Sequence, residues 1–241
     1  MIFSAVFRAI GQMDDPRFQR VLLLGVGLSV GALILASIIV AALINWLVGP
    51  SVTLPWIGQV DWIGKVASLS SIPLMLVLSI FLMIPVASAI TSLFLDQVAD
   101  AVEERHYPGL PPATEVPFMD GVRDGLSMLG VMIVANLAAL VFYLLLAPIA
   151  PIIFYLLNGF LLGREYFMLA AMRRVGRSGA IKLRRKHLPL IWGTGIVMAI
   201  PLTIPIVNLL VPVLGAAAFT HVFHALTGAA ATGERHPDRA R

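Results

Sequence analysis

The chain contains no cysteine and few charged residues. The absence of cysteine excludes disulfide bonds, thiol nucleophiles and Cys-ligated metal sites. Charged residues make up 12% of the 241 residues, about half the share found in soluble domains, and hydrophobic residues make up 59%. So few polar residues cannot cover the surface of a soluble protein of this size. The composition therefore excludes an ordinary soluble domain, a disordered chain and a nucleic-acid-binding protein, despite a net charge of +4.

Motifs that carry enzymatic chemistry are also missing. The sequence has no Walker loop, dinucleotide fingerprint, HExxH or GxSxG pattern. We therefore expect no enzyme, no cofactor and no metal, and a transport ATPase would need its motor from another chain.

Four long stretches contain no Asp, Glu, Lys or Arg: residues 21–60, 66–95, 125–163 and 188–233. About 20 apolar residues in a helix cross the hydrocarbon core of a membrane, so each stretch allows at least one crossing. We expect an all-α integral membrane protein with one domain over residues 1–241 and a short polar tail at 233–241.

The first two stretches predict two long transmembrane helices, at about residues 16–48 and 66–106. The apolar core of the first is too long for a cleaved signal peptide, so we expect it to stay as an anchor. The second carries prolines that predict a kink, and it becomes amphipathic near its end. Four acidic residues are expected on the polar face of that end: Asp96, Asp100, Glu103 and Glu104.

The last two stretches predict Pro-interrupted helical hairpins, at about residues 125–163 and 188–227. In the first hairpin, Pro148 and Pro151 leave a second arm that is short for a full crossing. Short arms favour hairpins that penetrate the membrane only partly and that are covered by protein or line a wet cavity. Kinked helices that cross completely are the alternative.

The basic residues are distributed unevenly between the two sides that this topology predicts. If both hairpins enter and leave on the same side, all of the 17 Lys and Arg residues except Lys65 share that side. The positive-inside rule makes it cytoplasmic, together with both termini.

Several segments resemble those of one known family. They are Asn158-Gly159, Gly163-Arg164-Glu165-Tyr166-Phe167, Arg173-Arg174, the acidic helix ending at Tyr107-Pro108-Gly109, and the run Ile204-Pro205, Asn208-Leu209-Leu210, Pro212-Val213, Gly215-Ala216 and Phe219-Thr220-His221. In this order and spacing, over nearly the whole chain, they resemble the CysZ sulfate permease family, also named after an etoposide-induced membrane protein.

The resemblance implies an all-helical, multi-pass protein of the bacterial inner membrane that admits sulfate to the cytoplasm for cysteine biosynthesis. It also implies a homo-oligomer with a pore, and hairpins that penetrate the membrane partly. The partners expected are sulfate or a related oxyanion, membrane lipids and further copies of the chain, without nucleic acid. A non-transporting membrane scaffold or lipid-binding protein of the same fold is the alternative.

The residues proposed to bind sulfate lie at the start of the first long helix. Asp15 and Pro16 have the types that begin a helix, and Arg17 and Arg20 then lie one turn apart. The resemblance implies an arginine pair here, but Gln19 replaces its first member. An acidic N-cap also opposes an anion. The alternative interpretation is that Arg17 and Arg20 only anchor the helix at the cytoplasmic side of the membrane.

Further candidates lie in the hairpins. Asn158 and Asn208 are expected to cap the hairpin turns or, alternatively, to line a pore. Arg164 is expected to form a structural ion pair with Glu165, and the basic segment that follows favours lipid head groups over sulfate. His221 and His224 lie three residues apart, on one helix face, and are expected to form packing hydrogen bonds rather than a metal site.

The charge distribution makes a topology prediction. Because Ser178 and Thr232 lie on the predicted cytoplasmic side, a cysteine at either position should resist membrane-impermeant reagents in intact cells. The chain lacks native cysteine, so each variant reports one site. Labelling before permeabilisation would contradict the scheme, and equal labelling from both sides would indicate dual topology.

Overall fold

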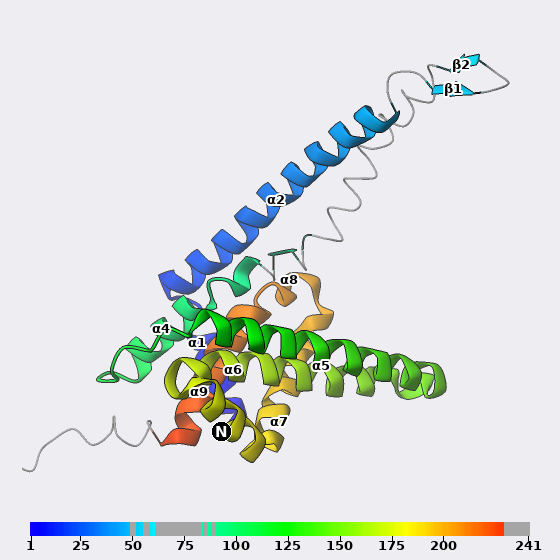
Figure 1. Cartoon of the computed structure of the whole chain (residues 1–241). Helices are drawn as coiled ribbons and strands as arrows, with labels where there is room; N and C mark the ends of the chain where they lie inside the picture. Colours follow the sequence, from blue (N-terminus) through cyan, green and yellow to red (C-terminus); the bar gives the residue numbers. More distant parts are fainter. Residues whose placement is uncertain (49–51, 55–57, 61–82, 84–85, 88–89, 229–241) are drawn as a thin grey trace, which may run out of the picture. The chain divides into compact units, whose positions relative to one another are not determined.

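The computed structural model describes residues 1–48, 52–54, 58–60, 83, 86–87 and 90–228 (Figure 1). Its elements are α1 (Ile2–Gly11), α2 (Pro16–Val48), β1 (Val52–Leu54), β2 (Gly58–Val60), α4 (Leu95–His106), α5 (Phe118–Leu145), the 3₁₀ helix η1 (Ala147–Ile149), α6 (Ala150–Lys186), α7 (Leu188–Ala199), the 3₁₀ helix η2 (Ile200–Thr203), α8 (Pro205–Asn208) and α9 (Val211–Thr227). The predicted helical class is confirmed, and β1 and β2 form only a short antiparallel hairpin.

The chain divides into two compact units. One consists of Met1–Leu22 with Leu93–Arg241, and the other of Leu23–Ser92. The first unit contains α1, α4 to α9 and the first turns of α2, and the contacts analysed below lie within it.

Three helices of the described residues are long and apolar enough to cross a membrane. They lie within Pro16–Val40, Phe118–Leu145 and Ala147–Lys186. A multi-pass membrane protein follows from their length and composition. The second long helix expected from the sequence lies mostly outside the described residues. Its end is interrupted by a turn at residues 93–94, after which α4 starts at Leu95.

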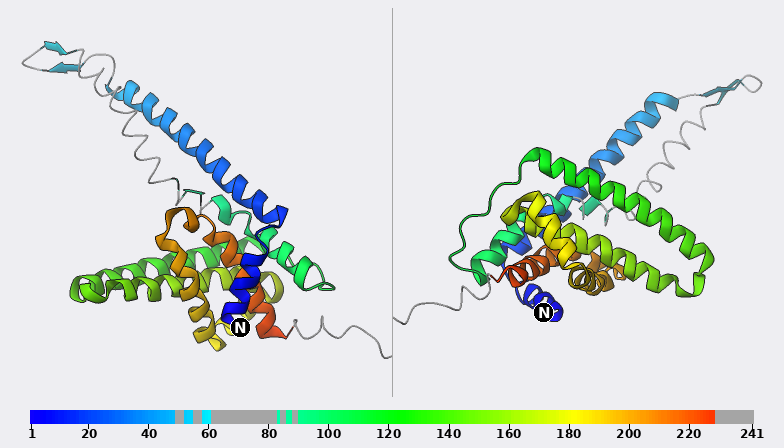
Figure 2. Two further views of the ribbon diagram at one scale, coloured as in Figure 1. Left: turned by 180° about the vertical axis from the view of Figure 1, so that it is seen from behind. Right: turned by 60° about the horizontal axis from the view of Figure 1, so that its bottom comes forward.

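The first hairpin consists of α5 and α6, which lie side by side (Figure 2). The turn between them contains Pro148, as expected, in η1. The second arm is longer than the sequence indicated, because α6 continues without interruption past Gly163. It kinks only at Gly176, where the backbone adopts φ 66° and ψ 172°. Glycine suits this position because L side chains rarely adopt a positive φ.

The second hairpin has shorter arms. The 12 residues of α7 and the 17 residues of α9 rise about 18 and 26 Å, respectively. Both lengths fall below the roughly 30 Å of a hydrocarbon core. Partial penetration therefore stays the prediction for this hairpin.

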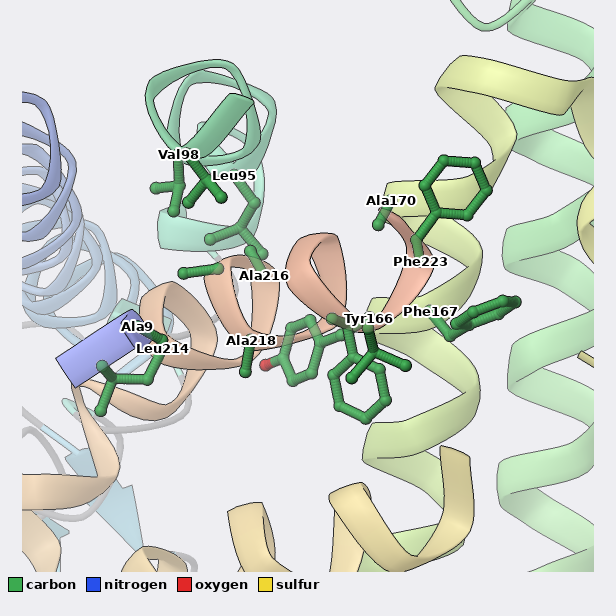
Figure 3. Packing of buried hydrophobic residues seen from close by; sticks show 14 of the residues in the cluster. Ala9, Leu95, Val98, Tyr166, Phe167, Ala170, Leu214, Ala216, Ala218 and Phe223 are labelled. Carbon is green, nitrogen blue, oxygen red and sulfur yellow. The ribbon is translucent and has the colours of Figure 1, made fainter. Parts of the chain in front are cut away.

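Helix α9 is the centre of the first unit. Every residue from Val211 to His224 is buried, and α9 packs against α1, α4, α6 and α7. Figure 3 shows its small residues, including Ala216 and Ala218, among Leu95 and Val98 of α4 and Tyr166 and Phe167 of α6. A helix that is apolar on all sides is stable where other elements surround it.

Helices α6 and α7 pack through glycine. A Cβ on Gly195 would collide with the Gly159 carbonyl oxygen, and a Cβ on Gly163 would lie 2.7 Å from the Ile191 carbonyl oxygen. Small residues at these positions let the two backbones touch, as in many membrane helix pairs.

This contact predicts that Gly195→Ala destabilises the protein by about 1–3 kcal/mol, because the added methyl group has no space. Gly130→Ala in α5 is the matched control, since a Cβ there meets nothing within 4 Å. It should be neutral or stabilising, as alanine favours helices. Thermal unfolding of the purified protein in detergent measures both. Equal midpoints for the two variants would refute the close packing.

Candidate functional site

The start of α2 holds the three residues predicted to bind sulfate. The backbone N–H of Arg17 donates to Oδ1 of Asp15 over 2.9 Å, so Asp15 caps the helix as its sequence position indicates. Arg17, Gln19 and Arg20 are all exposed. Nη1 of Arg17 lies 2.5 Å from a carboxylate oxygen of Glu104. Arg20 forms no ion pair with any described residue, so its guanidinium is the cation available to an anion.

The most elaborate polar cluster lies where α4, α6 and α9 meet. It consists of Asp96, Asp100, Glu103, Tyr107, Arg173, Arg174, His221 and His224. At its centre, Glu103 accepts hydrogen bonds from Nε and Nη2 of Arg174 over 2.9 and 2.6 Å. It also accepts one from Nε2 of His224 over 2.8 Å. This paired geometry is the strong form of an arginine–carboxylate contact.

Arg173 reinforces the same centre. Its side chain is 6% exposed, and it pairs with Asp100 and lies 3.8 Å from Glu103. Its Nη1 also donates to the Asp96 carbonyl oxygen over 3.2 Å. Two guanidinium groups of α6 thus pair with carboxylates of α4.

These partners control the ionisation of Glu103. Burial by itself would raise the pKa of the carboxyl group. The hydrogen bonds from His224 and Arg174 and the charges of Arg173 and Arg174 outweigh it and lower the pKa from 4.5 to about 2. Glu103 is therefore a carboxylate at neutral pH, and Nε2 of His224 must be the donor toward it.

An aromatic and imidazole layer adjoins Glu103. The Tyr107 hydroxyl and Nδ1 of His221 share a hydrogen bond of 2.9 Å, and the Tyr107 and His224 rings lie 4.2 Å apart. The rings of His106 and His221 meet edge to face at 4.8 Å. Burial and the charges of Arg105 and Arg8 lower the pKa of His106. The predicted packing hydrogen bonds of His221 and His224 are confirmed.

A cleft of about 520 Å³ opens beside this cluster. Its charged lining consists of Asp100, Glu103, Glu104 and Arg174. Arg174 also donates to the Pro111 carbonyl oxygen over 2.5 Å, which fastens the proline-rich linker after α4 to α6. The three carboxylates repel a dianion, and the one arginine in the lining is already paired with Glu103. The cleft therefore does not suit sulfate.

The asparagines do not both occupy hairpin turns. Asn158 lies inside α6, where its Nδ2 donates to the Phe154 carbonyl oxygen over 2.9 Å. The predicted turn-capping role of Asn158 is therefore wrong, because the side chain bonds within its own helix. Asn208 does lie at the turn, as the last residue of α8.

Arg164 makes different contacts from those expected. It is 4% exposed and donates to the Ser127 hydroxyl over 2.9 Å and to Met128 Sδ, both on α5. The predicted ion pair with Glu165 is wrong: among the described residues, no carboxylate lies within 4.0 Å of Arg164. Adjacent helical residues point in different directions, which explains the difference.

Sequence reasoning missed the role of Glu103. It placed Glu103 on the polar face of α4, whereas the structure buries it. The sequence does contain a signal for this burial, because Leu95, Ala99 and Glu103 follow one another at four-residue intervals and share a helix face. The partners Arg173 and Arg174, by contrast, come from a distant part of the sequence.

The lowered pKa of Glu103 predicts a pH-dependent stability. Ionised Glu103 stabilises the fold above about pH 4.5, and this contribution is lost as the pH falls toward 2. Glu103→Gln should remove it and cost about 3–5 kcal/mol at pH 7, because the arginines lose a buried partner. The unfolding midpoint, measured in detergent from pH 7 to 2.5, tests this.

Glu104→Gln is the matched control, since Glu104 is exposed and pairs with the exposed Arg17. It should cost less than about 1 kcal/mol and keep the acid sensitivity of the wild type. A Glu103→Gln protein with the stability and pH profile of the wild type would contradict the assignment.

Comparison with known proteins adds the family. No individual curated protein shows significant similarity to the chain. The sequence model of the family described as sulfate transporter CysZ/etoposide-induced protein 2.4 matches residues 5–212. This match includes most of α1 and all of α2 and α4 to α8, with the candidate residues at the start of α2 and in α4 and α6. The chain belongs to the sulfate transporter CysZ/etoposide-induced protein 2.4 family.

Proposed function

We propose that the protein passes sulfate across the bacterial inner membrane into the cytoplasm, as a channel or permease that supplies cysteine biosynthesis. The family match over residues 5–212 is the observation that carries this proposal. The described helices are compatible with it, because three of them are long and apolar enough to cross a membrane. We propose the orientation from the basic residues, with both termini cytoplasmic.

The proposed point of sulfate contact is the start of α2. Guanidinium groups suit sulfate because their N–H donors match its oxygen atoms. Glu104 already neutralises Arg17, and Asp15 occupies the helix N-terminus. Arg20 therefore contributes most of the attraction, while Gln19 can add a neutral hydrogen bond.

The exposed face of α5 supports a membrane or oligomer contact. Only 6% of the most apolar 18-residue segment of α5 is buried within the chain. Lipid tails or further copies of the chain would cover such a surface. We propose a homo-oligomer with a pore. The alternative is a non-transporting scaffold or lipid-binding role, because the family also holds non-transporting members.

The Arg20 assignment predicts that Arg20→Ala weakens sulfate binding by about tenfold or more, because a charge-assisted hydrogen bond is lost. Arg17→Ala should have a smaller effect of the same sign, and Gln19→Arg should hold or tighten binding. Equilibrium binding of radiolabelled sulfate to the purified protein is the appropriate measurement, since insertion yield does not affect it.

Sulfate uptake in cells that lack their own importers provides the functional readout. The wild type should restore uptake, and Arg20→Ala should reduce uptake per inserted molecule. Wild-type affinity in the Arg17→Ala/Arg20→Ala double variant would eliminate this site. Failure of the wild type to support uptake would favour the scaffold.

A further inference from the structure

Three arginines of α6 lie near a carboxylate of α5, but only one of them pairs with it. They are Arg164, Arg177 and Arg184, and the carboxylate is Asp124 of α5. Nε of Arg177 lies 3.8 Å from Oδ1 of Asp124, and both side chains are about one-fifth exposed. The charges of Arg164 and Asp124 both act on Arg184. Helices α5 and α6 lie side by side in Figures 1 and 2, and the Arg177–Asp124 contact crosses between them.

The kink at Gly176 explains how residues so distant in sequence come together. On a straight helix, Arg164 and Arg184 would lie roughly 30 Å apart, at 1.5 Å per residue. The positive φ of Gly176 breaks the helix direction between them. Arg177 and Arg184 are then two turns apart on the last segment of α6, so both can face the Asp124 side.

The cluster has more donors than acceptors. The Nε atoms of Arg164, Arg177 and Arg184 are buried and have no hydrogen-bond partner among the described residues. Arg164 is the most extreme case, because its two described partners, Ser127 and Met128, are neutral. A buried guanidinium is costly without an anion. The carboxylates that act on this cluster are Asp124 and Glu165, and two carboxylates cannot neutralise three guanidinium groups.

We propose that Arg164, Arg177, Arg184 and Ser127 bind a tetrahedral oxyanion between α5 and α6. An oxyanion supplies the missing negative charge and accepts hydrogen bonds from several N–H donors at once. Two sources share this chemistry, namely the phosphate of an anionic lipid and free sulfate. The site goes beyond the proposed function, because it rests on the geometry of α5 and α6 and is tested by binding rather than by transport.

The test measures two probes on the purified, delipidated full-length chain in a phosphate-free detergent. Radiolabelled sulfate is titrated at equilibrium in the Arg20→Ala background, which removes the contribution of α2. Phosphatidylglycerol is followed by native mass spectrometry, with diacylglycerol as the lipid that lacks phosphate. Binding of either probe is expected, and the probe that binds identifies the source. Binding of neither probe would overturn the proposal.

The variants assign binding to the cluster. Arg164→Gln and Arg184→Gln should each lower the affinity for the probe that binds by about tenfold. Lys182→Gln is the matched control, because it removes one positive charge from an exposed position on the same segment and should change affinity less than twofold. Equal losses of affinity in all three variants would overturn the proposed site, because they would show that binding depends only on the overall positive charge.

Asp124→Asn separates binding from structure. It removes the carboxylate that competes with the oxyanion, so affinity should rise several-fold. A purely structural Asp124–Arg177 pair predicts unchanged or lower affinity, and that result would overturn the proposal. Gel filtration and helical circular dichroism confirm that each variant is folded before it is compared. If this site binds its probe but the protein supports no sulfate uptake, only the proposed transport function is refuted.

Discussion

The contact of Glu103 with Arg174 and His224 is the interaction on which the first unit depends. It joins α4, α6 and α9, three helices whose other contacts are mainly apolar and therefore non-directional. Glu103 and His224 are buried and the Arg174 side chain is only 13% exposed, so breaking these contacts would leave a buried carboxylate without its partners. The same arginine holds the proline-rich linker through Pro111, so one carboxylate sets both the helix arrangement and the path of the chain after α4.

The ion pairs of the first unit narrow the possible sites for an anion. Carboxylates of α4 gather around Arg173 and Arg174 and leave an acidic cleft. Guanidinium groups that form no ion pair with a described residue include those of Arg20 and Arg164, and the Nε atom of Arg164 also has no described hydrogen-bond partner. An oxyanion would meet repulsion at the cleft and attraction at the arginines, which supports sulfate or phosphate chemistry there.

The sequence could predict the features that follow from apolar length and helical spacing. Helix α2 covers the range its composition indicates, and Pro148 marks the turn of the first hairpin. The partners of Arg164 and Glu103 could not be predicted in this way, because periodicity assigns a residue to a face and not to a neighbour. The kink at Gly176 was also missed, since a glycine inside a helical pattern does not by itself indicate a change of direction.

Sulfate flux through the purified protein in liposomes tests the central claim most directly, because no other cellular component contributes. Vesicles loaded with buffer and placed in radiolabelled sulfate should accumulate the label faster with the protein than without it, and excess unlabelled sulfate should reduce that difference. Flux equal to that of protein-free vesicles, from protein shown to be folded and inserted, would contradict the account.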